Sequence, residues 1–83
     1  MMGTAMVNRE DLKDWVLAAL VAAGGQASIV QVARHIWITY KGELERSGDL
    51  FYTWQYDMRW AATKLRHDGR LAPADRTGVW RLC

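Results

Sequence analysis

Residues 53–82, TWQYDMRWAATKLRHDGRLAPADRTGVWRL, decide the fold of this chain. Apolar side chains in the first half of the stretch recur at spacings of four, three and four, which predicts a helix over residues 53–67 with one buried face. That face consists of Trp54, Met58, Ala61 and Leu65. Asp68-Gly69 ends the helix, because glycine accepts the left-handed backbone that follows many helix C-termini. A short strand over residues 70–73, a polar turn over 74–78 and a returning strand over 79–82 then predict a β-hairpin.

The sequence before this stretch predicts two more helices. The first begins near Asn8, which caps a helix together with Asp11 three residues on, and Gly24-Gly25 ends it. Its apolar face consists of Leu12, Val16, Ala19, Leu20 and Ala23. The second helix begins at a capping box formed by Ser28 and Gln31. Its apolar face consists of Ile29, Val32, Ala33 and Ile36, and Tyr40 extends it.

A helix that leads directly into a small hairpin is typical of a winged helix-turn-helix, in which that helix enters the major groove of DNA and the hairpin lies beside it. We therefore expect a mainly α domain with a small antiparallel β-hairpin, made of three helices plus a wing. Residues 8–83 are expected to form this winged-helix DNA-binding domain, and residues 1–7 a flexible N-terminal tail.

Three connecting regions are less regular in pattern. Residues 26–27 form a short extended link, which some winged helices turn into a third strand. Residues 36–40 are rich in β-forming side chains, so the end of the second helix is expected to be irregular. Residues 41–50 are polar and contain two glycines, which predicts a connector, with one helical turn around residues 43–46 as an option.

The composition fits one small domain. The chain has 83 residues, of which 51% are hydrophobic and five are tryptophan, and this apolar content is well above that of a disordered segment. The single cysteine, Cys83, excludes an internal disulfide and a cysteine-based zinc site, which favours a cytoplasmic location. The apolar run over residues 15–23 is too short to span a bilayer, and the acidic residues before it argue against a signal peptide. We expect no membrane partner.

Positive charge is concentrated in the C-terminal part of the chain. The whole chain has a net charge of +2 and a pI near 9.0. Beyond residue 50, six arginines and lysines accompany three aspartates, whereas the first 50 residues carry five basic and six acidic side chains. The positive field therefore surrounds the third helix and the hairpin, which are the elements that would contact DNA. The mild net charge permits binding to nucleic acid without requiring it.

The face of the third helix opposite its buried side chains carries the predicted DNA contacts. Arginine can donate two hydrogen bonds to guanine in the major groove, and arginine, threonine and tyrosine side chains contact phosphates. At the tip of the hairpin, Arg76 and Thr77 can reach a phosphate or the minor groove, although turn chemistry alone also explains residues 75–78. The alternative for the helix is a face that is merely solvated. The predicted DNA-binding residues are Tyr52, Thr53, Gln55, Tyr56, Arg59, Thr63, Arg66, Arg76 and Thr77.

The tryptophans divide into two groups. Trp15, Trp54 and Trp80 fall on or near inward faces, so we expect them in the core and not as stacking platforms for a single strand. Trp80 shares one side of the last strand with Leu82, and the two are expected to close the core. Trp37 and Trp60 are not assigned to either side, and an exposed tryptophan at these positions would indicate a partner surface.

Two segments resemble the N-terminal winged-helix domain of Mrr-type restriction endonucleases. That family shows a Trp-Ala pair in a helix, a Leu-x-x-x-Gly-x-Leu stop and a Gly-Val-Trp-x-Leu strand. The counterparts here are Trp60-Ala61, Leu65 with Gly69 and Leu71, and residues 78–82. The likeness covers most of residues 9–82 and implies a DNA-binding fold. Family members usually continue into a nuclease domain that lies outside this likeness, so the resemblance does not imply cleavage.

No catalytic site, metal site or cofactor is predicted. A nuclease of the Mrr type needs acidic residues that hold a divalent cation and an acid-x-lysine element. The string Asp11-Leu12-Lys13 has that spacing, but it lies in the first turn of an amphipathic helix, and we interpret it as a chance match. His35 and His67 lack a cysteine partner and zinc-ligand spacing. We therefore expect a binding protein that is not an enzyme.

We expect the chain to bind double-stranded DNA, as the targeting module of a restriction-type system or as a stand-alone transcription regulator. Its further partners would be a second copy of the chain or a nuclease partner domain. The alternative is a winged helix used for protein–protein interaction or dimerisation, which the modest charge also allows. Leu17 and Val21, which lie beyond the inward stripe of the first helix, would then form the partner face.

Overall fold

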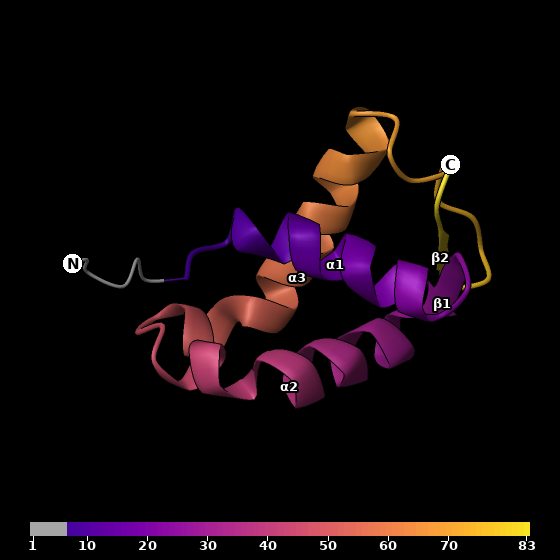
Figure 1. Cartoon of the computed structure of the whole chain (residues 1–83). Coiled ribbons are helices and arrows are strands. Elements are labelled where there is room, and N and C mark those ends of the chain that lie inside the picture. Colours follow the sequence, from indigo (N-terminus) through magenta and orange to yellow (C-terminus); the bar gives the residue numbers. More distant parts are fainter. Residues whose placement is uncertain (1–6) are drawn as a thin grey trace.

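The computed structural model describes residues 7–83 of the chain. This part contains three helices and two short strands (Figure 1). The elements in chain order are α1 (Asp11–Ala22), β1 (Gln26–Ser28), α2 (Ile29–Glu45), α3 (Leu50–His67) and β2 (Val79–Arg81). The tail expected over residues 1–7 lies outside the described residues except for Val7, which is half-buried against the core. No helix of the described part is long and apolar enough to cross a membrane.

Local hydrogen bonds set both ends of α1. The carboxylate of Asp11 accepts a hydrogen bond from the backbone N–H of Asn8 at 3.0 Å, and the Asn8 side chain accepts one from the N–H of Glu10 at 2.9 Å. The helix ends where Gly24 and Gly25 adopt φ values of +88° and +112°, which side chains with a Cβ rarely tolerate. The predicted stop of this helix is therefore confirmed. The helix begins at Asp11, three residues after the predicted cap at Asn8, and no side-chain hydrogen bond caps its first turn.

The second helix begins as predicted and runs further than predicted. The Ser28–Gln31 capping box is present, with its two bonds at 2.8 and 3.1 Å. The helix is irregular at Tyr40, where φ is −118° and ψ is 19°, as the β-forming side chains indicated. It then continues to Glu45, because Leu44 is completely buried in the core.

The connector expected over residues 41–50 is therefore much shorter, and only residues 46–49 separate α2 from α3. At its far end, α3 begins at Leu50, three residues before the predicted start. Leu50 is itself buried, so the apolar face of α3 extends one turn further towards the N-terminus. The two helices are joined by a tight turn of the helix-turn-helix kind.

The sheet joins the two halves of the chain. β1 and β2 pair antiparallel, with Gln26 opposite Arg81, Ala27 opposite Trp80 and Ser28 opposite Val79. On the other side of β2, the predicted strand over residues 70–73 is reduced to a single bridge between Leu71 and Leu82. Pro73 limits this pairing, because proline has no N–H to donate to a ladder. We refer to the loop over residues 72–78, which this bridge closes, as the wing.

The core lies between the three helices and is closed by the sheet. Each helix packs against the other two, and Figure 1 shows α1 crossing α3. Trp80, 6% exposed, is buried on the sheet side, and Leu82 packs against the same core. The predicted inward face of α3, made of Trp54, Met58, Ala61 and Leu65, is buried. The fold is the predicted one, a small mainly α winged helix-turn-helix.

Candidate nucleic-acid interface

The outer face of α3 is exposed along its whole length. Because the inward side chains recur every three or four residues, the opposite side chains form a second stripe with the same spacing. Tyr52 and Tyr56 are 83% and 77% exposed, which is high for aromatic side chains that could bury apolar area. Gln55 and Arg59 are exposed beside them. The outer stripe consists of Tyr52, Tyr56, Arg59 and Thr63.

Arg59 has no acidic partner within residues 7–83. The carboxylate of Asp57, two residues earlier, instead accepts a hydrogen bond from the hydroxyl of Thr53 at 2.8 Å. The guanidinium of Arg59 thus keeps all its donors available. An arginine with free donors at the middle of α3 has the chemistry that bidentate base recognition needs.

The three predicted threonines have already used their hydroxyl protons. Thr53 donates to Asp57, Thr63 donates to the backbone carbonyl of Arg59 at 3.1 Å, and Thr77 donates to Asp75. A hydroxyl has one proton to donate, and afterwards its oxygen serves only as an acceptor. Phosphate oxygens accept hydrogen bonds, so these three hydroxyls are poor phosphate ligands unless they first break the bonds they make here.

The wing is ordered by Asp75. Its carboxylate accepts hydrogen bonds from the backbone N–H and the hydroxyl of Thr77 and pairs with the guanidinium of Arg81. The Thr77 hydroxyl, followed by the Arg81 guanidinium, holds the pKa of the Asp75 carboxyl well below its usual range. Arg76, between Asp75 and Thr77, is exposed and forms no ion pair in the described part of the chain. The wing therefore presents one free positive charge on an internally bonded turn.

Arg66 lies apart from the other predicted contacts. It is half-buried, and its guanidinium carbon is 5.8 Å from the ring centroid of Trp80. A cation at this distance is attracted to the ring face. The side chain thus covers the core tryptophan and does not extend from the outer stripe.

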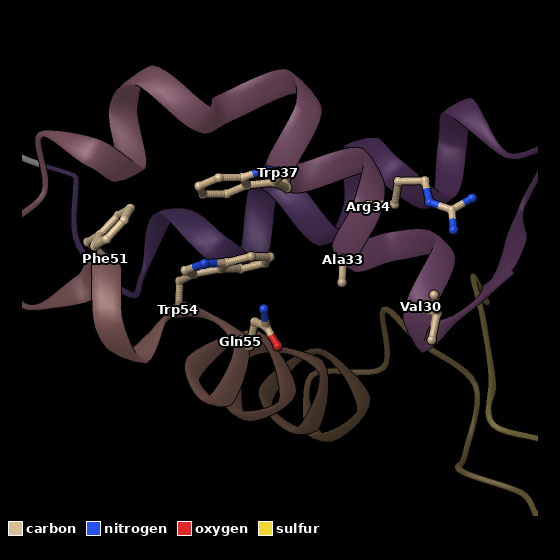
Figure 2. Close-up of a pocket in the computed structure, with 7 residues that line it drawn as sticks. All are labelled: Val30, Ala33, Arg34, Trp37, Phe51, Trp54 and Gln55. Carbon is tan, nitrogen blue, oxygen red and sulfur yellow. The ribbon is translucent and has the colours of Figure 1, made fainter.

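A groove between α2 and α3 adjoins the outer stripe (Figure 2). It encloses about 380 Å³. Figure 2 shows the indoles of Trp37 and Trp54 one above the other across the groove, with Phe51 at one end and Arg34 at the other. The two indole planes are 7° from parallel, and their centroids are 6.1 Å apart. The lining residues are Val30, Ala33, Arg34, Trp37, Phe51, Trp54 and Gln55.

Sequence reasoning missed this groove and the arginine at its end. Three of the lining residues also line a second hollow of about 460 Å³, which reaches Tyr56 and Arg59. Arg34 is exposed and unpaired within residues 7–83. The signal was present in the spacing of Val30, Arg34 and Trp37, which places them along one side of α2 beside its inward stripe. The two hollows have two arginines and no acidic residue in their lining.

The other chemical groups show ordinary roles. Within the described residues, no three side chains of histidine, cysteine, aspartate or glutamate gather as metal ligands. In the string Asp11-Leu12-Lys13, the Asp11 carboxylate accepts a hydrogen bond from the backbone N–H of Asn8, and Lys13 pairs with Glu10 at 2.9 Å. His67 is exposed, and its ring lies 3.9 Å from the Asp68 carboxylate.

Comparison with models of protein families, with curated proteins and with solved structures found no match to this chain. The residues that carry the resemblance to Mrr-type enzymes can therefore be judged only by their roles in the fold. Ala61, Leu65, Leu71 and Trp80 are buried, and Gly69 adopts a positive φ of +78°. In this chain these residues bury the end of α3 and set the turn that leads into the wing.

Proposed function

We propose that this chain binds double-stranded DNA, with α3 in the major groove and the wing on a flanking phosphate or minor groove. The observation that supports this most strongly is the outer stripe of α3, where Arg59 has an unpaired guanidinium and two tyrosines are almost fully exposed. An unpaired arginine beside exposed tyrosines favours a ligand with hydrogen-bond acceptors and flat apolar surfaces. Base edges in a groove present both.

In this proposal the residues divide by role. Arg59 donates to guanine, and Gln55 is suited to adenine, which pairs with the amide of glutamine. Tyr52 and Tyr56 contact the sugar–phosphate backbone, and Arg76 contacts a phosphate from the wing. Thr53, Thr63 and Thr77 contribute by holding neighbouring groups, since their protons are already donated.

The resemblance to Mrr-type enzymes suggests a biological setting. A winged helix of this kind would bring a nuclease partner domain to its DNA as the targeting module of a restriction-type system, without cleaving DNA itself. A stand-alone transcription regulator needs the same interface. The targeting module and the regulator would have different protein partners, but α3 would read DNA in the same way in both.

A second candidate is a winged helix that binds a protein or a second copy of itself. The groove between α2 and α3 favours it, because this groove is lined by Trp37 and Phe51 and bordered by Val30, which is 65% exposed. Large apolar side chains that border a hollow are typical of interaction sites. The face expected on α1 is weaker, since Leu17 packs against the core and only Val21 is largely exposed.

A titration of the protein into labelled random-sequence duplex DNA separates the two candidates. With DNA binding through phosphates, log affinity falls linearly with log salt, and each contacted phosphate contributes a slope of roughly −0.9. We expect a slope that corresponds to a handful of contacts. Absence of binding at low salt, together with self-association in sedimentation, would favour the protein-interaction candidate.

A further inference from the structure

A cluster of positive charges surrounds Trp60, on the side of α3 that faces the start of α1. Trp60 is half-buried against the core. The guanidinium carbon of Arg9, from the segment just before α1, lies 4.2 Å from the centroid of its ring. The ammonium of Lys64, one turn along α3, lies 6.0 Å from the same centroid. The attraction between cations and a tryptophan ring holds both side chains near this position.

The cluster has little negative charge to balance it. Arg9, Arg59 and Lys64 form no ion pair within residues 7–83. The acidic residue next to Arg9 is Glu10, whose carboxylate is bound to Lys13 at 2.9 Å. That hydrogen bond, and to a smaller extent the charges of Arg9 and Lys64, lower the pKa of Glu10. One carboxylate shared with Lys13 offsets only part of the repulsion among the three cations. An anion bound among them would relieve that repulsion.

A hollow lies at the centre of this arrangement. It encloses about 390 Å³ and is lined by Arg9, Tyr56, Arg59, Trp60 and Thr63. Two of these residues are arginines, and arginine binds phosphate with paired N–H donors. The lining contains no acidic residue. Tyr56 and Arg59 belong to the outer stripe of α3, so the hollow adjoins the surface that we propose for DNA.

We propose that this hollow binds a backbone phosphate of the DNA whose bases α3 reads, with Arg9 from its lining as the first phosphate contact and Lys64, which lies beside Trp60 outside the lining, as the second. The inference rests on the proposed function and adds to it a second anchoring point, from the segment before α1. Arg59 would face the base edges while Arg9, held over Trp60, faces the adjacent strand. Contacts to phosphate fix the register of a protein on the duplex and carry no sequence information.

The test measures how the affinity of the full chain for duplex DNA depends on salt. Arg9→Ala and Lys64→Ala should each make the log–log salt slope shallower by roughly 0.9, and the double variant by about twice that. Each variant should weaken binding to preferred and random duplexes by the same factor. Arg70→Ala removes an exposed arginine that neither lines the hollow nor lies over the Trp60 ring, and this control should leave the slope unchanged.

Folding controls keep the result unambiguous. Circular dichroism melting should show that the variants remain folded, and Arg9→Lys should restore most of the slope because it keeps the charge. An unchanged slope in Arg9→Ala, with normal binding by the unaltered chain, would overturn the phosphate site and leave the proposed function intact. If Arg9→Ala weakened binding to the preferred duplex and to the random duplex by different factors, that result would also overturn the phosphate site. Failure of the unaltered chain to bind any duplex would overturn both proposals.

Discussion

At the scale of single residues, the predicted contact residues differ in whether their hydrogen-bond donors are free to bind a ligand. The sequence predicts nine residues as DNA contacts. Arg59 and Arg76 carry free guanidinium groups, whereas the threonine hydroxyls donate within the chain and Arg66 covers Trp80. Specificity would thus depend on fewer side chains than the pattern of residue types indicates. Substitution of Arg59 or Arg76 alone should therefore change DNA binding measurably.

Arg59→Ala should weaken binding to a preferred site by about 1–3 kcal/mol, with a smaller loss on random duplex, because a base contact distinguishes sequences. Arg76→Ala should weaken binding to both duplexes equally, since a phosphate contact does not distinguish them. Anisotropy titrations on a site obtained by selection from random DNA would measure both. Equal losses from the two substitutions on both duplexes would show that α3 does not read bases.

At the scale of elements, hydrogen bonds between near neighbours set the end of α1, the start of α2 and the turn of the wing. The capping box of α2, the glycine end of α1 and the Asp75 turn of the wing each join residues less than seven positions apart. The wing has little buried apolar surface, so its conformation depends on Asp75. A loop held by one carboxylate should respond to acid.

The wing should loosen as the pH falls. The pKa of Asp75 is lowered in the folded chain by Thr77 and Arg81, so its stabilising effect is complete above the unfolded pKa of about 3.9 and is lost as the pH falls towards the folded pKa. A carbon-detected NMR titration should place the Asp75 midpoint below that of an ordinary aspartate. Asp75→Asn should remove this transition and raise amide exchange at Thr77, while melting at neutral pH changes little. A normal Asp75 midpoint would mean that the turn is not held by its carboxylate.

At the scale of the whole molecule, Trp80 joins elements that lie far apart in the sequence. It lies opposite Ala27 in the sheet and is covered by Arg66 from α3. The first strand, the third helix and the last strand therefore meet at one indole ring. Because this ring is 6% exposed, its removal would open the core beneath the sheet.

Trp80→Ala should lower the free energy of unfolding by about 3–5 kcal/mol, as expected for a large buried aromatic side chain. Urea denaturation followed by circular dichroism would measure the loss. Trp80→Phe, which keeps a buried ring, should cost clearly less. A small effect of Trp80→Ala would mean that the sheet does not close the core.

The sequence by itself determined which segments form helices, where α2 begins, where α1 and α3 end, and which face of α3 is buried. These features follow from side-chain periodicity and from hydrogen bonds between near neighbours, such as Ser28 with Gln31, and both are visible in a single stretch of chain. The same periodicity placed Trp80 in the core. It also placed Arg59 on the face of α3 opposite the buried side chains.

The tertiary structure alone decided the features that join distant residues. The burial of Leu44 extended α2 and shortened the connector, the pairing of β1 with the last strand completed the sheet, and Pro73 confined the other strand to one bridge. Arg9 and Trp60 meet across 50 positions of sequence, and the α2–α3 groove has one wall on each helix. Periodicity along one element shows which of its faces is buried. It does not show which residues that face contacts, because packing brings together residues that are far apart in the sequence.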